Sequence, residues 1–113
     1  MNDDAIDAMD APGHVYEQWW LATLGRTIVW ARLRVRAAGT GEVFDSDGNT
    51  LVYDSEDTAR AALMDADFVA LDGLDEDDAL ARGFGLDELQ PPRADDDAQL
   101  RDLMVQAPRG GRA

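Results

Sequence analysis

The sequence contains no cysteine and no lysine, and His14 is its single histidine. Without cysteine it can form no disulfide, no thiolate zinc site and no cysteine nucleophile. Its two serines, Ser46 and Ser55, fall at a predicted turn and a predicted helix cap. We therefore expect neither serine to act as the nucleophile of a Ser-His-Asp triad. A transition-metal site would depend almost entirely on carboxylates, which is uncommon. Nor is there a glycine-rich nucleotide-binding motif. We therefore expect a protein that is not an enzyme and that uses no metal and no cofactor.

The sequence also lacks a long apolar run and the basic-then-apolar pattern of a secretory signal. We therefore expect no membrane span and no membrane partner, and a cytoplasmic location follows by default. Its 113 residues are enough for one domain with a modest core. We expect residues 1–11 to be a mobile acidic N-terminus and residues 12–92 to be a single globular domain. Residues 93–113 are predicted to be a C-terminal helix followed by a disordered tail.

Acidic residues are abundant where basic ones are scarce. There are 24 Asp and Glu against 10 Arg, which gives a formal net charge of −14. Composition bias in the host is one explanation of this excess, and a functional acidic surface is the other. The acids are densest between residues 65 and 78, where seven of fourteen positions are acidic: Asp65, Asp67, Asp72, Asp75, Glu76, Asp77 and Asp78. These seven are the candidate partner-binding residues.

Apolar and polar residues alternate with period two through residues 26–37, which indicates a long β-strand. Gly39-Thr40 and Asp47-Gly48 are suited to tight turns, so residues 42–46 and 49–54 are predicted to continue an antiparallel meander. Two-residue turns at both places would set Val35 opposite Phe44 and Phe44 opposite Leu51. One sheet face would then collect these apolar side chains: Leu33, Val35, Phe44, Leu51 and Tyr53.

Helices are predicted on either side of the meander. Aromatic and aliphatic residues in 13–24 fall on one helical face, and Asp54 or Ser55 can cap a helix over 55–66. Residues 68–71 form a short apolar run that is a possible fourth strand. Shorter acidic helices are predicted at 75–82 and 96–105. The fold class is therefore α+β, with a three- to four-stranded antiparallel meander sheet packed by the first two helices.

Arg32, Arg34 and Arg36 form a basic stripe on the long strand, with Trp30 beside it. Such a stripe could contact nucleic acid through phosphate binding and base stacking. In the predicted register, however, the arginines face carboxylates across the sheet, as the pairs Arg34–Asp45 and Arg32–Asp47. We therefore favour ion pairs within the sheet and expect no direct nucleic-acid contact. Trp30 stays a candidate partner-binding residue at an uncovered edge of the stripe.

The segment Asp45–Asn49 has some features of a calcium-binding loop, with Gly48 at the position of the sharp turn. Val43 would occupy the first ligand position, and its side chain has no oxygen. The flanking residues alternate like strands rather than forming helices. A hairpin is therefore the favoured interpretation, and no metal site is predicted.

Two functions remain as hypotheses. The first is a non-enzymatic protein whose carboxylate-rich surface binds a basic partner, either a nucleic-acid-binding protein blocked by phosphate-like charge or a toxin neutralised as immunity proteins do. The second is an accessory or self-associating domain, in which case a homodimer would use the sheet face around Ile28, Trp30, Val43 and Val52. In that second case the acidic surface is only a solvated face.

Overall fold

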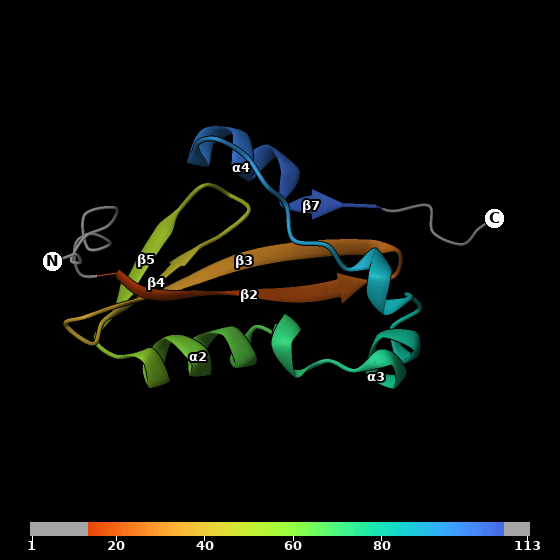
Figure 1. Cartoon of the computed structure of the whole chain (residues 1–113), viewed down its shortest axis with the longest axis horizontal. Coiled ribbons are helices and arrows are strands. Elements are labelled where there is room, and N and C mark those ends of the chain that lie inside the picture. Colours follow the sequence, from red (N-terminus) through yellow and green to blue (C-terminus); the bar gives the residue numbers. More distant parts are fainter. Residues whose placement is uncertain (1–13, 108–113) are drawn as a thin grey trace, which may run out of the picture.

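The computed structural model describes residues 14–107, with the backbone alone at positions 14 and 15 (Figure 1). The predicted mobile N-terminus at residues 1–11 and the last six residues of the predicted tail lie outside this range. The fold is α+β, as predicted. Its antiparallel sheet follows the order β5-β4-β3-β2-β6, and β7 also pairs with β3. The strands are β2 (His14–Leu24), β3 (Thr27–Arg36), β4 (Gly41–Phe44), β5 (Thr50–Tyr53), β6 (Val69–Ala70) and β7 (Val105–Gln106).

The prediction of a helix over residues 13–24 is wrong, because this segment is the long strand β2. It pairs with β3 along its length, down to Leu24 opposite Thr27, and Gly25 turns the chain with a φ of +59°. Trp20 and Leu21 are both buried, one on each face of the sheet. A strand covered on both faces buries adjacent residues instead of alternating ones. That spacing, together with the flanking aromatics, resembled a wide helical face.

The β3-β4-β5 meander is confirmed, but its predicted register is wrong. Phe44 lies opposite Arg32 rather than Val35, and opposite Thr50 rather than Leu51. Both connections are longer than two residues: Arg36 N donates to Thr40 O, and Asp45 N donates to Asn49 O, each at 3.0 Å. Gly39 and Gly48 adopt positive φ at the ends of these loops, as in three-residue hairpins.

The change of register moves two side chains to opposite faces. The observed partners of Phe44 differ from the predicted ones by an odd number of positions along each neighbouring strand. Phe44 therefore joins the arginine face, and Val43 joins Leu33. The guanidinium carbon of Arg32 lies 5.0 Å from the centre of the Phe44 ring, which is a cation–π contact. The apolar face predicted from the sequence therefore loses Phe44 and gains Val43.

Both faces of the sheet are covered (Figure 1). Helix α2 (Glu56–Asp65) buries Ala59 and Leu63 against one face, and the side chain of Ser55 caps its first turn as predicted. The C-terminal helix α4 (Asp97–Leu103) covers the other face, where Leu100 and Met104 are buried, and the strand β7 that follows it pairs with β3. The core of the described chain therefore includes Leu100 and Met104, which lie in the segment predicted as a C-terminal helix after residue 92.

The acid-rich segment forms short elements at one edge of the sheet. Strand β6 pairs with Trp20 and Leu21 of β2, which confirms a short strand within residues 68–71. The 3-10 turn η1 (Leu71–Gly73) and helix α3 (Glu76–Ala81) follow, and a second 3-10 turn, η2 (Leu86–Glu88), leads toward α4. Within residues 14–107 no helix has the length and apolarity needed to cross a bilayer.

Candidate functional site

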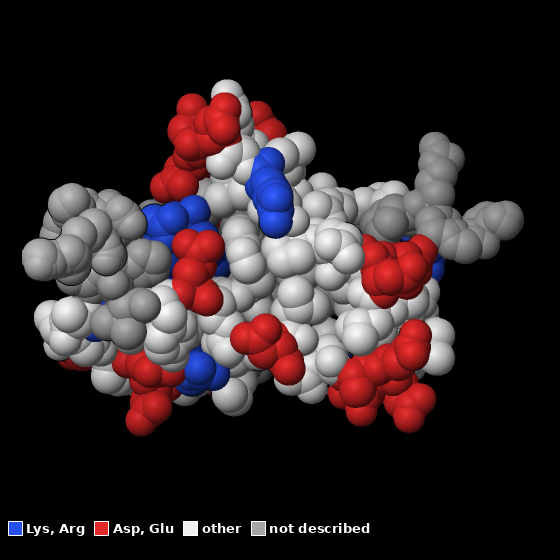
Figure 2. Space-filling view, viewed as in Figure 1, with Lys and Arg blue, Asp and Glu red and all other residues white. Residues whose placement is uncertain are grey.

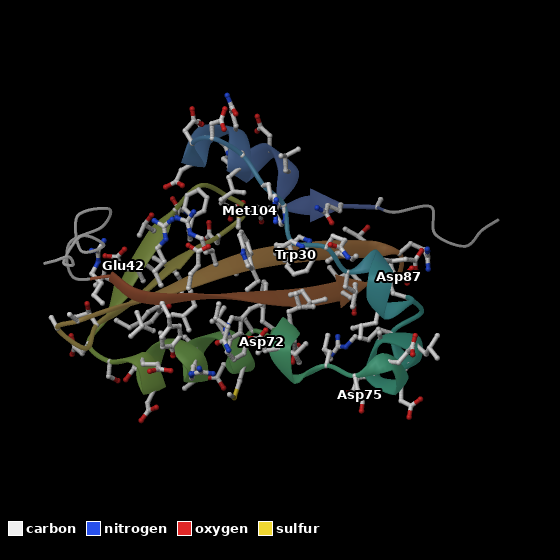
Figure 3. All side chains as sticks on the ribbon, in the orientation of Figure 1. Trp30, Glu42, Asp72, Asp75, Asp87 and Met104 are labelled. Atoms are coloured by element: carbon white, nitrogen blue, oxygen red, sulfur yellow. The ribbon has the colours of Figure 1, made fainter. Side chains whose placement is uncertain are left out.

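The seven candidate carboxylates of residues 65–78 are all exposed. They lie on the end of α2, on the loop after it, on η1 and at the start of α3. Asp72 and Asp75 lie on the side of the sheet that carries α2 and α3 (Figure 3). In the space-filling view, acidic atoms gather over α3 and again over α4, and smaller acidic groups lie elsewhere on the same face (Figure 2).

Four of these seven residues also have structural roles. Asp75 and Asp78 form a reciprocal capping box at the start of α3, where Asp78 N donates to Asp75 Oδ1 at 2.8 Å and Asp75 N to Asp78 Oδ2 at 3.2 Å. Asp67 ends α2 in a left-handed conformation with a φ of +68°, which Asp tolerates better than most residues. Asp72 accepts a hydrogen bond from Gln18 Nε2 at 3.4 Å.

The other three acids have no such role. Asp65, Glu76 and Asp77 have no hydrogen-bond or ion-pair partner for their side chains among the described residues. The sequence between residues 61 and 81 contains no arginine that could compensate them. The α3 end of the molecule therefore presents negative charge to solvent, and we call the seven residues the acidic surface.

The arginines of the stripe form ion pairs, as predicted, but their partners are not the predicted carboxylates. The nitrogen–oxygen distances are 3.1 Å for Arg32–Asp97, 3.0 Å for Arg34–Glu17 and 2.6 Å for Arg36–Glu42. The side chain of Asp45 instead accepts hydrogen bonds from Asp47 N and Asn49 N within its own hairpin. These contacts also identify Asp45–Asn49 as a turn. Within the part of the chain that the structure describes, no group of three or more acidic or histidine side chains could hold a metal ion.

The predicted position of Trp30 at an uncovered edge is wrong. Its side chain is 0% exposed, beneath the segment that carries Met104 (Figure 3). Its Nε1 donates to Oε1 of Gln106 at 3.0 Å, and its ring meets that of Trp19 edge-to-face at 6.0 Å between centroids. Trp30 is therefore a core residue, and a partner could reach it only if α4 and β7 moved away.

A cleft of about 600 Å³ lies between α2, the β6–η1 segment and the end of α3. Its lining is mostly apolar and includes Trp20, Met64, Phe68, Leu74 and Ala81. Three charged side chains, Arg60, Asp78 and Arg82, complete it. Sequence reasoning missed this site because its walls come from separate elements. The sequence did contain one indication of the site: Arg60 and Arg82 are the only basic residues between positions 55 and 92, and both line the cleft.

A polar cluster fixes Arg60 at one wall of the cleft. Tyr16 Oη donates to the Glu56 carboxylate, Arg60 Nε donates to the same carboxylate at 2.8 Å, and Arg60 Nη2 lies 3.3 Å from Tyr16 Oη. Desolvation, and then the hydrogen bond to Glu56, raise the pKa of Tyr16. The hydrogen bonds from Tyr16 and then from Arg60 lower the pKa of Glu56. The cluster links β2 to α2 and holds the guanidinium carbon of Arg60 5.7 Å from the Trp20 ring centre.

Comparison of the chain with protein-family models, with curated proteins and with solved structures finds no match.

Proposed function

We propose that this protein is a non-enzymatic interaction protein whose acidic surface binds a basic partner and inhibits or sequesters it. The observation that carries the proposal is the uncompensated charge at the α3 end. Glu76 and Asp77 on α3, and Asp65 at the end of α2, are exposed and have no side-chain partner among the described residues. The partner class is a nucleic-acid-binding protein or a basic toxin, because both present clustered cations.

The physical basis is long-range electrostatic attraction. A concentrated patch of one sign attracts a partner of the opposite sign and accelerates association, and salt weakens the effect. The Asp75–Asp78 capping box orders the backbone at the start of α3, and this holds the carboxylates of that helix in place. Little side-chain ordering is then needed at the Asp positions, whose side chains are short.

Self-association through the Trp30 face is the weaker alternative. Three of the four residues that would form that face, Ile28, Trp30 and Val43, are buried in the core of the described chain. Val52 is 64% exposed, but it lies on the edge strand β5. An acidic surface without any partner is the other alternative, and the following experiment distinguishes it.

The test is a pull-down from lysate with the intact chain at low and at high salt. We expect basic proteins to be retained at low salt and released at high salt. The triple variant Asp65→Asn, Glu76→Gln, Asp77→Asn should retain much less of them. A control triple of equal charge change, Asp54→Asn, Asp95→Asn, Asp102→Asn, alters exposed acids elsewhere and should retain them.

Two outcomes would contradict the proposal. One is that no basic protein is retained at low salt. The other is that both triple variants lose binding equally, because total charge rather than the acidic surface would then be responsible. A retained partner should also lose its nucleic-acid binding or its toxicity when this protein is added in excess.

A further inference from the structure

The cleft beside α3 holds a cation, Arg82, that no carboxylate of residues 14–107 neutralises. Arg82 is half-buried, and its Nη1 donates to the hydroxyl of Thr23 at 3.0 Å. It forms no ion pair with any carboxylate of residues 14–107. A guanidinium that is partly removed from water and has only a neutral partner is less stable than a paired one.

Asp78 does not supply the missing counter-charge. It lies one helical turn before Arg82 and also lines the cleft, so a pair between the two would be the expected contact. The capping box instead holds its Oδ2 at the backbone N–H of Asp75. Arg60, the other cation of the cleft, is already paired with Glu56. Arg82 is therefore the group in the cleft that is free to bind an anion.

The rest of the cleft suits the apolar part of a ligand. Trp20 is 2% exposed, and Phe68 and Leu74 are half-buried beside it. A volume of about 600 Å³ is within the range of small-molecule sites, which are mainly apolar with a few polar groups that fix orientation. The cleft combines a mostly apolar lining with Arg82, its one cation without a carboxylate partner among the described residues, and this is complementary to a ligand with one anionic group and an apolar body.

We propose that this cleft binds a small monocarboxylate with an apolar body, with the carboxylate on Arg82 and the body against Trp20, Phe68 and Leu74. A guanidinium binds a carboxylate through two parallel hydrogen bonds, which makes arginine selective for this group. This proposal does not depend on the proposed binding of a basic partner, although Asp78 belongs both to the cleft lining and to the acidic surface. The acidic surface nearby repels anions at long range, so the ligand is recognised by contact rather than by steering.

The test uses the intact chain and three probes with the same ten-carbon chain: decanoate, 1-decanol and decyltrimethylammonium. Binding is measured by tryptophan emission and by calorimetry at about 0.15 M salt, where charges more than about 8 Å apart are largely screened. We expect decanoate to bind about tenfold more tightly than decanol, as for a hydrogen bond to a charged group. The ammonium probe should bind most weakly.

Two variants locate the site. Arg82→Gln should remove the preference for decanoate over decanol, whereas the control Arg93→Gln, at an exposed position outside the cleft, should keep it. Ala81→Phe narrows the cleft from an exposed position and should weaken all three probes, which keeps the test informative if Arg82→Gln folds poorly. Equal or tighter binding of the ammonium probe, an unchanged preference in Arg82→Gln, or no saturable binding of decanoate would each overturn the proposal.

Discussion

The indole Nε1 of Trp30 donates a hydrogen bond to Oε1 of Gln106, 3.0 Å away and 76 positions later in the sequence. Beside it, Trp30 N donates to Met104 O at 2.8 Å, and β7 pairs with the Ile28–Val29 part of β3. The C-terminal segment therefore closes the sheet face that carries the arginine stripe. This closure turns Trp30 from a candidate surface residue into part of the core.

Replacing Gln106 with Ala should destabilise the fold by about 1–3 kcal/mol, because the buried indole N–H loses its acceptor. Urea unfolding followed by tryptophan emission measures the change. Gln106→Glu keeps an acceptor oxygen for the indole but loses the hydrogen bond that Gln106 Nε2 donates to Leu103 O at 3.2 Å, so it should recover only part of the loss. Val105→Ala, at a neighbouring position that is 54% exposed, should change the stability by less than about 0.5 kcal/mol. Equal stability of Gln106→Ala and the unmodified chain would show that the hydrogen bond contributes nothing.

Replacing Asp97 with Ala should cost about 1–3 kcal/mol, because it leaves the buried guanidinium of Arg32 without its anion. The Nε of Arg32 already has no hydrogen-bond partner, so the group has little alternative compensation. In an Arg32→Met background the same substitution should cost much less. A double-mutant cycle from urea unfolding measures this coupling. A coupling energy near zero would mean that the pair does not hold α4 on the sheet.

Gly41→Ala should destabilise the protein by about 1–3 kcal/mol through overpacking. A Cβ at this position would lie 2.8 Å from Cβ of Ala59 and 3.3 Å from the carbonyl oxygen of Ser55, where α2 approaches the sheet. Gly73→Ala is the matched control, since its Cβ would meet nothing within 4 Å. Thermal unfolding of the two variants compares them. If both lose the same stability, the close approach of α2 is not the reason that glycine is needed.

Acidification should remove the contribution of Glu42 to stability. The hydrogen bond from Arg36 lowers the pKa of Glu42 from its ordinary value of 4.5. Since the folded-state pKa lies below the unfolded one, the contribution is present above about pH 4.5 and is lost as the pH falls through the folded-state pKa. Glu42→Gln should therefore be less stable than the unmodified chain at pH 7. This gap, the difference between their free energies of unfolding, should close at low pH.

The pH test uses the difference between two proteins, because acidification also relieves repulsion among the other carboxylates in both of them. Urea unfolding at several pH values measures the gap. Asp65→Asn, at an exposed position in the last turn of α2 and without a side-chain partner among the described residues, is the control and should show no loss of stability at pH 7 that disappears on acidification. A gap for Glu42→Gln that persists unchanged to low pH would contradict the role of its ionised form.

Features that depend on neighbours in the sequence could be predicted from the sequence. The period-two alternation of β3, the Ser55 cap of α2 and the Asp75–Asp78 start of α3 all result from contacts within a few residues. The exposure of the acids between residues 65 and 78 could also be predicted, because short elements at the surface leave such side chains in solvent. These signals were sufficient for the fold class and for the acidic surface.

Other features were decided only by the tertiary structure. Residues 14–24 form a strand because pairing with β3 and cover on both faces outweigh a pattern that also fits a helix. Three-residue hairpin loops in place of the predicted two-residue turns exchanged the faces of Phe44 and Val43, and the turn residues specify loop length poorly. The burial of Trp30, the pairing of Arg32 with Asp97 and the cleft at Arg82 require segments far apart in the chain to meet. No local pattern encodes such contacts, because the free energy that determines them comes from burial over the whole domain.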